Sequence, residues 1–186
     1  MDRGSELYRL FLEGNKDAFD GIIKEYHSCV INFITGYTKN FHTAEDLAMD
    51  TFAELIASPN RFKFKCSLKT YLFTIAKNKA IDYLKKEKNR TAFISCSYNI
   101  QPAPFLCSPE DIAVCSQSSE SFNRCFSSLP RDYRVALYLI YSEDCSYKEA
   151  AKIMNKTEKQ ITNLVYRGKK ALKELLEKEV DSSEKY

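Results

Sequence analysis

Two helix-start signals stand eleven residues apart near the C-terminus of this chain. Ser146 with Glu149, and Thr157 with Gln160, each fit the capping box, in which a hydroxyl and a side chain three residues later satisfy each other's free backbone N–H groups. Asn155 lies between the two signals, and asparagine is the best residue after glycine for a left-handed turn. Two helices joined in this way are typical of a helix-turn-helix.

Each of these helices is expected to have one apolar side, and the second also has a polar, basic side. The apolar positions are Ala150, Ala151, Ile153 and Met154 in the first helix, and Ile161, Leu164, Val165 and Leu172 in the second. The outward positions of the second helix are Lys159, Thr162, Asn163, Tyr166, Arg167, Lys169 and Lys170. Recognition helices contact base edges with their N-terminal residues, while flanking cations contact phosphates. The pattern favours DNA binding over the alternative, a solvated basic face on an ordinary helical hairpin.

Composition limits what else the chain can be. Its 186 residues are 44% hydrophobic, which is enough for one or two small domains with their own cores. No apolar run reaches the ~18 residues of a membrane span, and no signal peptide is expected at the N-terminus. Seven cysteines show no CxxC motif and no metal-ligand spacing with the two histidines. We therefore expect a cytoplasmic protein with free thiols, no metal and no membrane insertion, while a redox-sensing cysteine remains an alternative.

The net charge of +3 hides a strong asymmetry between neighbouring segments. Residues 1–60 carry five Lys and Arg against ten Asp and Glu, whereas residues 61–90 carry ten Lys and Arg against two Asp and Glu. An acidic block beside a basic block indicates different partners for adjacent surfaces.

The hydrophobic pattern predicts an all-α protein with two small helical domains, near 1–90 and 109–180, joined by a flexible linker at 91–108. Within the first domain, Thr43 is expected to cap a helix that ends near Ser58, and Ser67 to cap a long helix that follows. The expected core positions of the earlier helix are Leu47, Phe52, Leu55 and Ile56. Further helix starts are expected at Ser108-Pro109 and at Leu129-Pro130, and the tail 181–186 is expected to fray.

Three stretches in register resemble one protein family over about 150 residues: 44–52, 67–86 and the helix-turn-helix that ends at Leu172. The family is the extracytoplasmic-function (ECF, group 4) class of bacterial RNA polymerase sigma factors. The resemblance implies an alternative sigma factor with no enzymatic activity and no cofactor. Such a protein binds core RNA polymerase and directs promoter-specific transcription initiation. Region 2 would be residues 1–90 and region 4 residues 109–180, and an anti-sigma factor is a usual partner.

The helix after Thr43 carries carboxylates four residues apart, at Asp46, Asp50 and Glu54, which places them on one face. Paired carboxylates can hold metals, but no histidine or further carboxylate set completes a site here. The resemblance makes this face the polymerase-binding surface, formed by Glu45, Asp46, Asp50 and Glu54. A solvated acidic stripe is the alternative. Met49 stands where the family often has glutamine.

Residues 61–67 interleave aromatic and cationic side chains. Single-stranded DNA is held by stacking on aromatic rings in a cationic groove, at roughly 1–3 kcal/mol per base. The resemblance makes this the loop that captures a base flipped from the melted minus-ten strand, although Phe62 and Phe64 could equally pack inward. Tyr71 stands where the family usually has tryptophan. The expected minus-ten residues are Phe62, Phe64, Tyr71, Lys77, Asn78, Lys79, Lys85 and Lys86.

For the minus-thirty-five element, the resemblance implies contacts from Lys159, Gln160, Thr162, Asn163, Tyr166, Arg167 and Lys170. Leu164 stands where many relatives have a cation, so base preference cannot be carried over. The resemblance implies two promoter elements less than two turns of duplex apart, which is about 60 Å at ~34 Å per turn. A linker of about 20 residues spans roughly 65 Å only when it is stretched.

Two other functions remain open. A stand-alone helix-turn-helix regulator that binds palindromic duplex DNA as a dimer accounts for the C-terminal segment, but leaves the acidic face and the aromatic loop unused. A nuclease that uses the acidic helix would need a metal-ligand set, and the sequence offers none.

Overall fold

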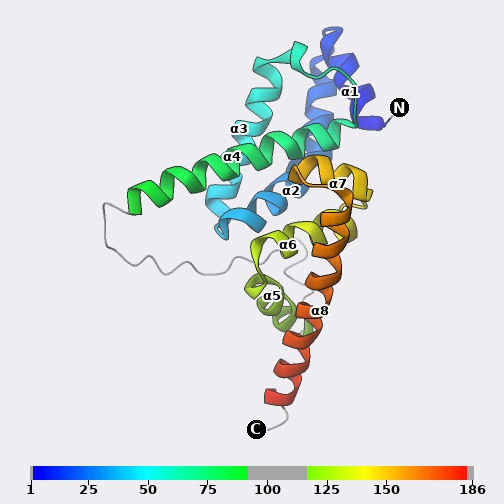
Figure 1. Ribbon diagram of the computed structural model, residues 1–186. Helices are drawn as coiled ribbons and strands as arrows, with labels where there is room; N and C mark the ends of the chain where they lie inside the picture. Colours follow the sequence, from blue (N-terminus) through cyan, green and yellow to red (C-terminus); the bar gives the residue numbers. More distant parts are fainter. Residues whose placement is uncertain (1, 92–116, 184–186) are drawn as a thin grey trace.

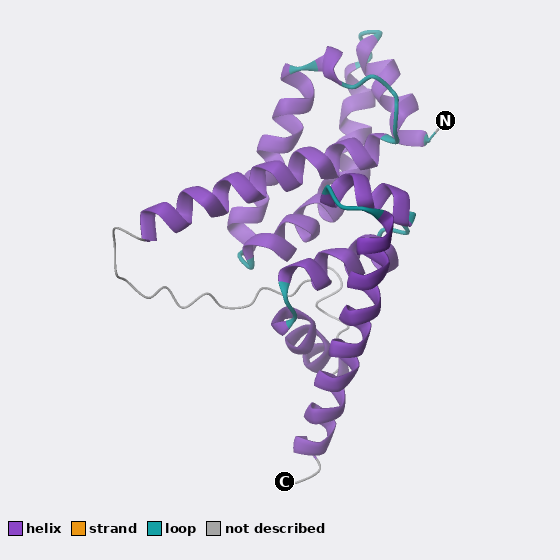
Figure 2. Ribbon diagram, in the orientation of Figure 1, coloured by secondary structure: helices purple, strands orange, loops and turns teal. Residues whose placement is uncertain are grey.

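The computed structural model of the protein describes residues 2–91 and 117–183, and all regular elements within these two ranges are helical (Figures 1 and 2). The first range holds α1 (Arg3–Leu12), α2 (Lys16–Thr38), α3 (Phe41–Ala57), the 3₁₀ turn η1 (Pro59–Arg61) and α4 (Leu68–Thr91). The second holds α5 (Gln117–Ser128), α6 (Arg131–Leu137), the π-helical turn η3 (Tyr138–Ser142), α7 (Tyr147–Met154) and α8 (Glu158–Ser183). The expected all-α fold is confirmed. Most of the predicted linker and the helix start at Ser108 lie outside the described residues.

The starts of α2, α3 and α4 are each fixed by a polar side chain. Asn15 accepts a hydrogen bond from the Ala18 N–H at the start of α2. The prediction that Thr43 caps α3 is wrong, because Asn40 is the cap and its Oδ1 accepts from the Thr43 N–H at 3.0 Å. Asn40 is a stronger N-cap than threonine and stands where the chain leaves α2. Ser67 caps α4 as expected, since its Oγ accepts from the Thr70 N–H at 3.2 Å.

The N-terminal half is built around α2, which packs against α1, α3 and α4. Phe33 of α2 is fully buried, and its ring lies 4.7 Å from that of Phe73 in α4. Tyr8 of α1 is also fully buried, and its hydroxyl donates to the backbone oxygens of Leu55 and Pro59. The expected core position at Ile56 is wrong, because this side chain is 47% exposed. Ile56 lies on the solvent side of α3 with Met49, seven residues earlier, whereas the adjacent Leu55 faces the core and is 1% exposed.

The predicted helix-turn-helix is confirmed in α7 and α8. Ser146 Oγ accepts from the Glu149 N–H while the Glu149 carboxylate accepts from the Ser146 N–H, so the first capping box is closed. Thr157 and Gln160 form the same reciprocal pair at the start of α8. Asn155 ends α7 in the left-handed conformation, with φ of 54°.

The axes of α6 and α8 come close because residue 168 has no side chain. A Cβ at Gly168 would lie 3.1 Å from Leu137 Cδ1 and 3.2 Å from Tyr133 Cβ, which is tighter than ordinary packing. This close contact fixes the direction in which α8 leaves the turn, and therefore which of its faces points outward.

The two halves of the chain are in contact. In Figure 1, α7 lies against α4, and α6 lies near the end of α2. The buried apolar residues of both halves form one continuous cluster, and the rings of Phe33 and Tyr138 lie 6.5 Å apart across the junction. Among the described helices, none combines the length and the apolar content needed to cross a bilayer.

We expect Ser146→Ala to lower the free energy of unfolding by about 1 kcal/mol, because the first capping box loses its hydroxyl acceptor. Thermal unfolding followed by circular dichroism measures this change. Ser146→Thr is the matched control, since threonine keeps the hydroxyl. Equal melting temperatures for the alanine and threonine variants would contradict a role for the capping box in stability.

Candidate nucleic-acid and polymerase interfaces

The outward side of α8 presents a continuous set of polar side chains. All seven predicted minus-thirty-five residues are exposed: Lys159, Gln160, Thr162, Asn163, Tyr166, Arg167 and Lys170. Ile161 and Val165 lie on the opposite side of α8 and are buried. One side of the helix therefore packs against the core, and the other side is exposed to solvent. The geometry is that of a recognition helix, whose exposed N-terminal half can enter a major groove.

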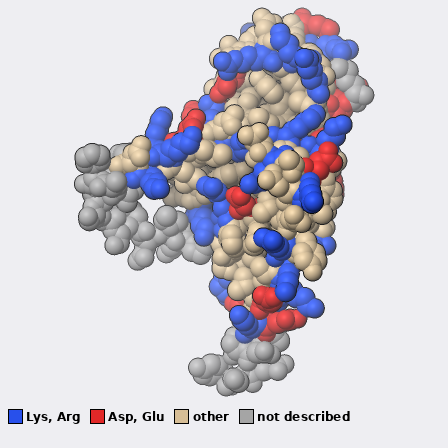
Figure 3. Space-filling model, in the orientation of Figure 1, with Lys and Arg blue, Asp and Glu red and all other residues tan. Residues whose placement is uncertain are grey.

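Cations and an aromatic ring extend this surface away from the first turn of α8. Lys169 Nζ lies 4.5 Å above the ring of Tyr141, which comes from η3 and is itself 52% exposed. Tyr166 is the most exposed large apolar residue described, at 71%. Figure 3 shows Lys and Arg side chains over this part of the molecule, with acidic side chains gathered toward the far end of α8. This charge pattern is suited to binding phosphates beside the turn that is predicted to read bases.

The acidic face of α3 is divided by the fold into two parts. Asp46 and Asp50 are exposed. Glu54 is engaged within the molecule, because its carboxylate lies 3.2 Å from Arg61 Nη1 and 3.0 Å from Lys79 Nζ. Glu45 lies 3.5 Å from the ring nitrogen of His42. Within the predicted polymerase-binding set, Asp46 and Asp50 are therefore the carboxylates most accessible to a partner.

Sequence reasoning missed the apolar part of this surface. Met49 is 59% exposed and Ile56 is 47% exposed, and their seven-residue spacing places them on one side of α3 beside the acidic residues. Exposed apolar groups beside charges are typical of protein–protein contact surfaces. The seven-residue spacing of Met49 and Ile56 could have indicated this apolar surface, but Ile56 was predicted to lie in the core.

The aromatic side chains of the loop between α3 and α4 pack against one another and against the protein core. Phe62 is 4% exposed, and its ring lies 5.5 Å from that of Tyr8, 4.7 Å from that of Phe64 and 5.0 Å from that of Tyr71. Phe64 has a φ of 54°, and the Arg9 guanidinium stands over its ring. Stacking of a base on Phe62 would require this loop to open, so the base-capture role stays a prediction.

Polar side chains of α4 differ in how far they reach into solvent. Asn78, Lys85 and Lys86 are exposed, whereas Lys79 is held by Glu54. Lys77 is only 9% exposed, and burial lowers its pKa below the usual lysine value. Asn78, Lys85 and Lys86 are therefore accessible on the surface of α4, whereas Lys77 is buried.

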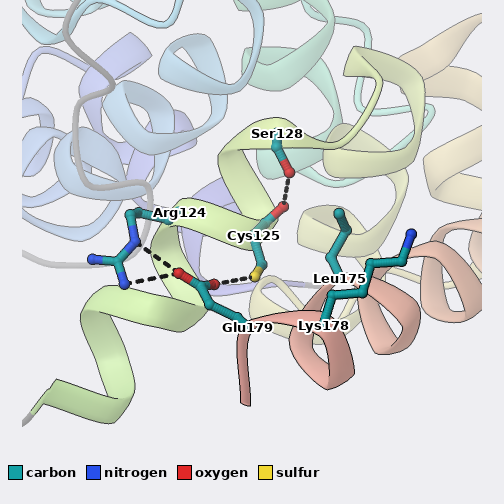
Figure 4. A pocket seen from close by; sticks show the side chains of 6 residues that line it. All are labelled: Arg124, Cys125, Ser128, Leu175, Lys178 and Glu179. Carbon is teal, nitrogen blue, oxygen red and sulfur yellow. Dashed lines mark hydrogen bonds and ion pairs between the residues drawn. The ribbon is translucent and has the colours of Figure 1, made fainter. Parts of the chain in front are cut away.

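A shallow hollow of about 360 Å³ lies between α5 and α8 (Figure 4). The Cys125 thiol donates to Glu179 Oε2 at 2.7 Å, and the Arg124 guanidinium lies 2.8 Å from Glu179 Oε1. Burial, followed by the hydrogen bond to Glu179, raises the pKa of the Cys125 thiol to about 11. This cluster ties the end of α8 to α5.

The four described cysteines are poor candidates for redox sensing. Burial raises the pKa of the Cys29 thiol to about 12 and that of Cys145 to about 11, and it also raises the pKa of Cys66. Redox-sensing cysteines need a lowered pKa, because the thiolate is the reactive form. The other three cysteines, Cys96, Cys107 and Cys115, lie outside the described residues.

Comparison with known proteins identifies both halves. The Sigma-70 region 2 family model matches residues 22–90, and the Sigma-70, region 4 model matches residues 119–172. The ECF RNA polymerase sigma factor SigM of Bacillus subtilis (strain 168) is 31% identical over 162 residues, covering 87% of this chain and 97% of that protein. SigW of the same organism is 27% identical, covering 88% of this chain and 91% of that protein.

Solved structures agree in fold. The sigma factor RpoE in complex with the anti-sigma factor NepR, from Bartonella quintana, superposes with a TM-score of 0.67 at 25% identity, covering 86% of this chain and 96% of that chain. CnrH in complex with the cytosolic domain of CnrY superposes with a TM-score of 0.65 at 18% identity, covering 95% of this chain and 98% of that chain.

Proposed function

Because this chain belongs to the extracytoplasmic-function sigma factors of RNA polymerase, we propose that its two helical halves divide promoter recognition between them. The chain is an alternative sigma factor that directs transcription initiation, since both sigma regions occur in it in order. In this proposal, region 2 spans residues 1–90, the linker 91–108 and region 4 residues 109–180, with a tail at 181–186. The protein acts in the cytoplasm by binding and catalyses no reaction of its own.

In region 2, α3 provides the surface for core RNA polymerase. Asp46 and Asp50 are its charged centre, and Met49 and Ile56 add exposed apolar area beside them. Glu54 acts indirectly, because it holds Arg61 and Lys79 in place. The adjoining loop and α4 bind the minus-ten element, with Asn78 at the exposed surface and Lys85 and Lys86 near phosphates.

In region 4, the first turns of α8 read the minus-thirty-five element. The observation that carries this assignment is that all seven predicted contact residues are exposed on one side of a helix whose other side is buried. Lys159, Gln160, Thr162 and Asn163 lie at the end that enters the groove, whereas Arg167 and Lys170 lie where the helix leaves it. Tyr166 lies between these two groups.

An anti-sigma factor is the proposed regulatory partner. Two sigma factors of the same fold were solved with such partners bound, NepR with RpoE and the cytosolic domain of CnrY with CnrH. Co-purification of the tagged protein from its native cells, followed by mass spectrometry, tests this proposal.

In vitro transcription with bacterial core RNA polymerase tests the function directly. The template is a library of genomic promoters, with and without the protein. We expect new transcripts whose start sites share a two-part motif. A stand-alone regulator would instead bind palindromic duplex DNA without polymerase and produce no new transcripts.

We expect Asn163→Ala to lower transcription from the identified promoters about tenfold, because each side chain that reads a base contributes roughly 1–3 kcal/mol of discrimination. The loss should be greatest on promoters with the best minus-thirty-five match and small on promoters that lack one. Lys173→Ala, an exposed change on the same helix outside the predicted contacts, is the control. An equal loss on both promoter classes would contradict base reading by Asn163.

A further inference from the structure

We propose that α1 is a positioning element for promoter binding, because it holds the aromatic loop (residues 58–67) in a conformation whose exposed cations, Lys63 and Lys65, bind phosphates of the minus-ten DNA. The inference rests on the proposed function, since it takes this loop and α4 as the surface for the minus-ten element. It adds two binding residues and a helix that precedes the residues matched by the Sigma-70 region 2 model, 22–90.

The start of the aromatic loop is hydrogen-bonded to α1 through the Tyr8 hydroxyl. This hydroxyl donates to the backbone oxygen of Leu55, in the last turn of α3, at 3.2 Å and to that of Pro59 at 3.1 Å. Burial, followed by the electrostatic effect of Tyr71, raises the pKa of Tyr8 to about 12. The hydroxyl therefore stays protonated at neutral pH and fixes the point at which the chain leaves α3.

The end of the aromatic loop is hydrogen-bonded to α1 through Asp2. The Asp2 carboxylate caps α1 by accepting from the Ser5 N–H at 3.2 Å, and it also accepts from the Leu68 N–H at 3.3 Å. Leu68 is the first residue of α4, and the first N–H groups of a helix have no partner within that helix. One carboxylate therefore joins the starts of α1 and α4.

Between these two ends, the rings of the aromatic loop lie against α1. The ring of Tyr8 lies 5.5 Å from that of Phe62 and 6.3 Å from that of Phe64. The Arg9 guanidinium stands 5.7 Å from the centre of the Phe64 ring. Phe64 has a φ of 54°, a left-handed conformation that is rare for a bulky residue and persists only where its surroundings enforce it. The contacts with α1 are part of those surroundings.

The first helix packs closely on α2, so it can serve as a fixed support. A Cβ at Gly4 would collide with the Tyr26 hydroxyl, which shows that the two helices approach as closely as a glycine permits. The rings of Phe11 in α1 and Phe19 in α2 lie 5.0 Å apart. Because α2 also packs against α3 and α4, α1 fixes the aromatic loop relative to the rest of the N-terminal half.

With its rings held inward, the aromatic loop exposes its cations. Lys63 and Lys65 alternate with the two phenylalanines, and both are exposed. Among the residues that the structure describes, neither lysine has an ion-pair partner, whereas Arg61 of the same loop is paired with Glu54. Figure 3 shows Lys and Arg side chains gathered over the end of the molecule that carries this loop. Two such ammonium groups on a fixed loop are suited to binding neighbouring phosphates.

The double variant Lys63→Ala with Lys65→Ala tests the phosphate contacts. Polymerase holoenzyme that carries it is titrated with a forked DNA containing the minus-ten element of a promoter found by in vitro transcription. Fluorescence anisotropy is recorded between about 50 and 200 mM salt. We expect about tenfold weaker binding at the lowest salt. The slope of log affinity against log salt should be smaller by about 1.5, since each phosphate contact contributes about 0.7 to 0.9.

Lys173→Ala with Lys178→Ala is the matched control for the loop variant. It removes the same charge from exposed positions of α8 outside the predicted contacts, and it should leave the slope unchanged. If the loop variant loses no more of the slope than this control, Lys63 and Lys65 bind no phosphate and the proposal is overturned.

Tyr8→Phe tests the positioning role of α1, because it keeps the ring and removes only the hydroxyl. Binding of the forked DNA should weaken about fivefold, as expected for the loss of a hydrogen bond. The same substitution in the Lys63→Ala, Lys65→Ala background should have no further effect, because Tyr8 acts through the two lysines. An equal loss in both backgrounds would mean a merely structural role and would overturn the proposal. Tyr37→Phe, which removes the hydroxyl of another buried tyrosine, is the control.

Variants of Asp2 separate the effect of position from that of charge. Asp2→Ala removes a carboxylate, so a general charge effect would tighten DNA binding, whereas loss of the bond to Leu68 should weaken it about threefold. Asp2→Asn loses the same charge but keeps an acceptor oxygen, and it should bind at least as tightly as the wild type. Tighter binding by both variants would overturn the role of α1. Asp2 is only partly buried, so these variants decide the matter if Tyr8→Phe does not fold.

The two proposals fail differently. If the wild type yields no transcripts with core polymerase, the promoter assignment fails, whereas the salt slopes of the free chain on single-stranded DNA still decide whether Lys63 and Lys65 bind phosphates. If transcription works but the loop variant keeps the wild-type slope, only the role of α1 and its loop is rejected.

Discussion

Arg134→Ala should lower the free energy of unfolding by about 3 kcal/mol, an effect large enough to remove much of the stability of a small domain. The Arg134 side chain is 2% exposed, and its guanidinium donates to the backbone oxygens of Ser127, Leu129 and Gly36. Alanine would leave these oxygens buried without a donor and would open a cavity. Urea unfolding followed by circular dichroism measures the loss.

The control for this prediction is Arg131→Ala, three residues earlier on the same helix. Arg131 is exposed and stands over the ring of Tyr37, so its loss should cost less than about 1 kcal/mol. Arg134→Lys should lower the free energy of unfolding by an amount between those of the two alanine variants. Its ammonium group keeps the charge but lacks the planar guanidinium that reaches three oxygens. Equal unfolding free energies for both alanine variants would show that Arg134 has no such role.

Replacing Asp46 and Asp50 together by lysine should weaken binding to core RNA polymerase by about 100-fold or more. Both carboxylates are exposed at the centre of the proposed polymerase surface, and reversed charges against a complementary surface cost several kcal/mol. Stability should change little, because neither side chain is buried. Affinity is measured by biolayer interferometry with immobilised core polymerase, and run-off transcription should fall in parallel.

The matched control reverses two other exposed acidic residues of region 2, as Glu13→Lys with Asp20→Lys. The change in net charge is identical, so a general electrostatic effect would weaken both variants alike. An equal loss of affinity for core polymerase in the two double variants would show that α3 is not the polymerase-binding surface. Ile56→Ser offers a second check, since it should weaken binding through the neighbouring apolar area without any charge change.

Features set by residues close in sequence were predictable. The two capping boxes and the left-handed Asn155 depend on side chains three residues apart and on one turn position, and the structure has all of them. The cap of α3 was assigned wrongly because Asn40 and Thr43 both suit the role by type. Only the end of α2 decides between them, because it places Asn40 at the first free N–H groups.

Features that depend on the meeting of distant segments could not be predicted. Glu54 belongs by spacing to the acidic stripe, but Arg61 and Lys79 come to it through the turn before α4. Phe62 was open to either orientation, and Tyr8 of α1 supplies the partner that keeps it inside. Lys69 and Glu143 form an ion pair between the two halves of the chain. Neither local sequence contains a pattern that predicts this contact.

The order in which the chain is made gives the Lys69–Glu143 contact a temporal consequence. The two residues are 74 positions apart, so at 5–20 residues per second a ribosome needs about 4 to 15 seconds to add the second after the first. During that interval the nascent N-terminal half can fold around α2, while the helices of the second half that contact it do not yet exist. The contact between α4 and α7 can therefore form only after the second half of the chain has been made.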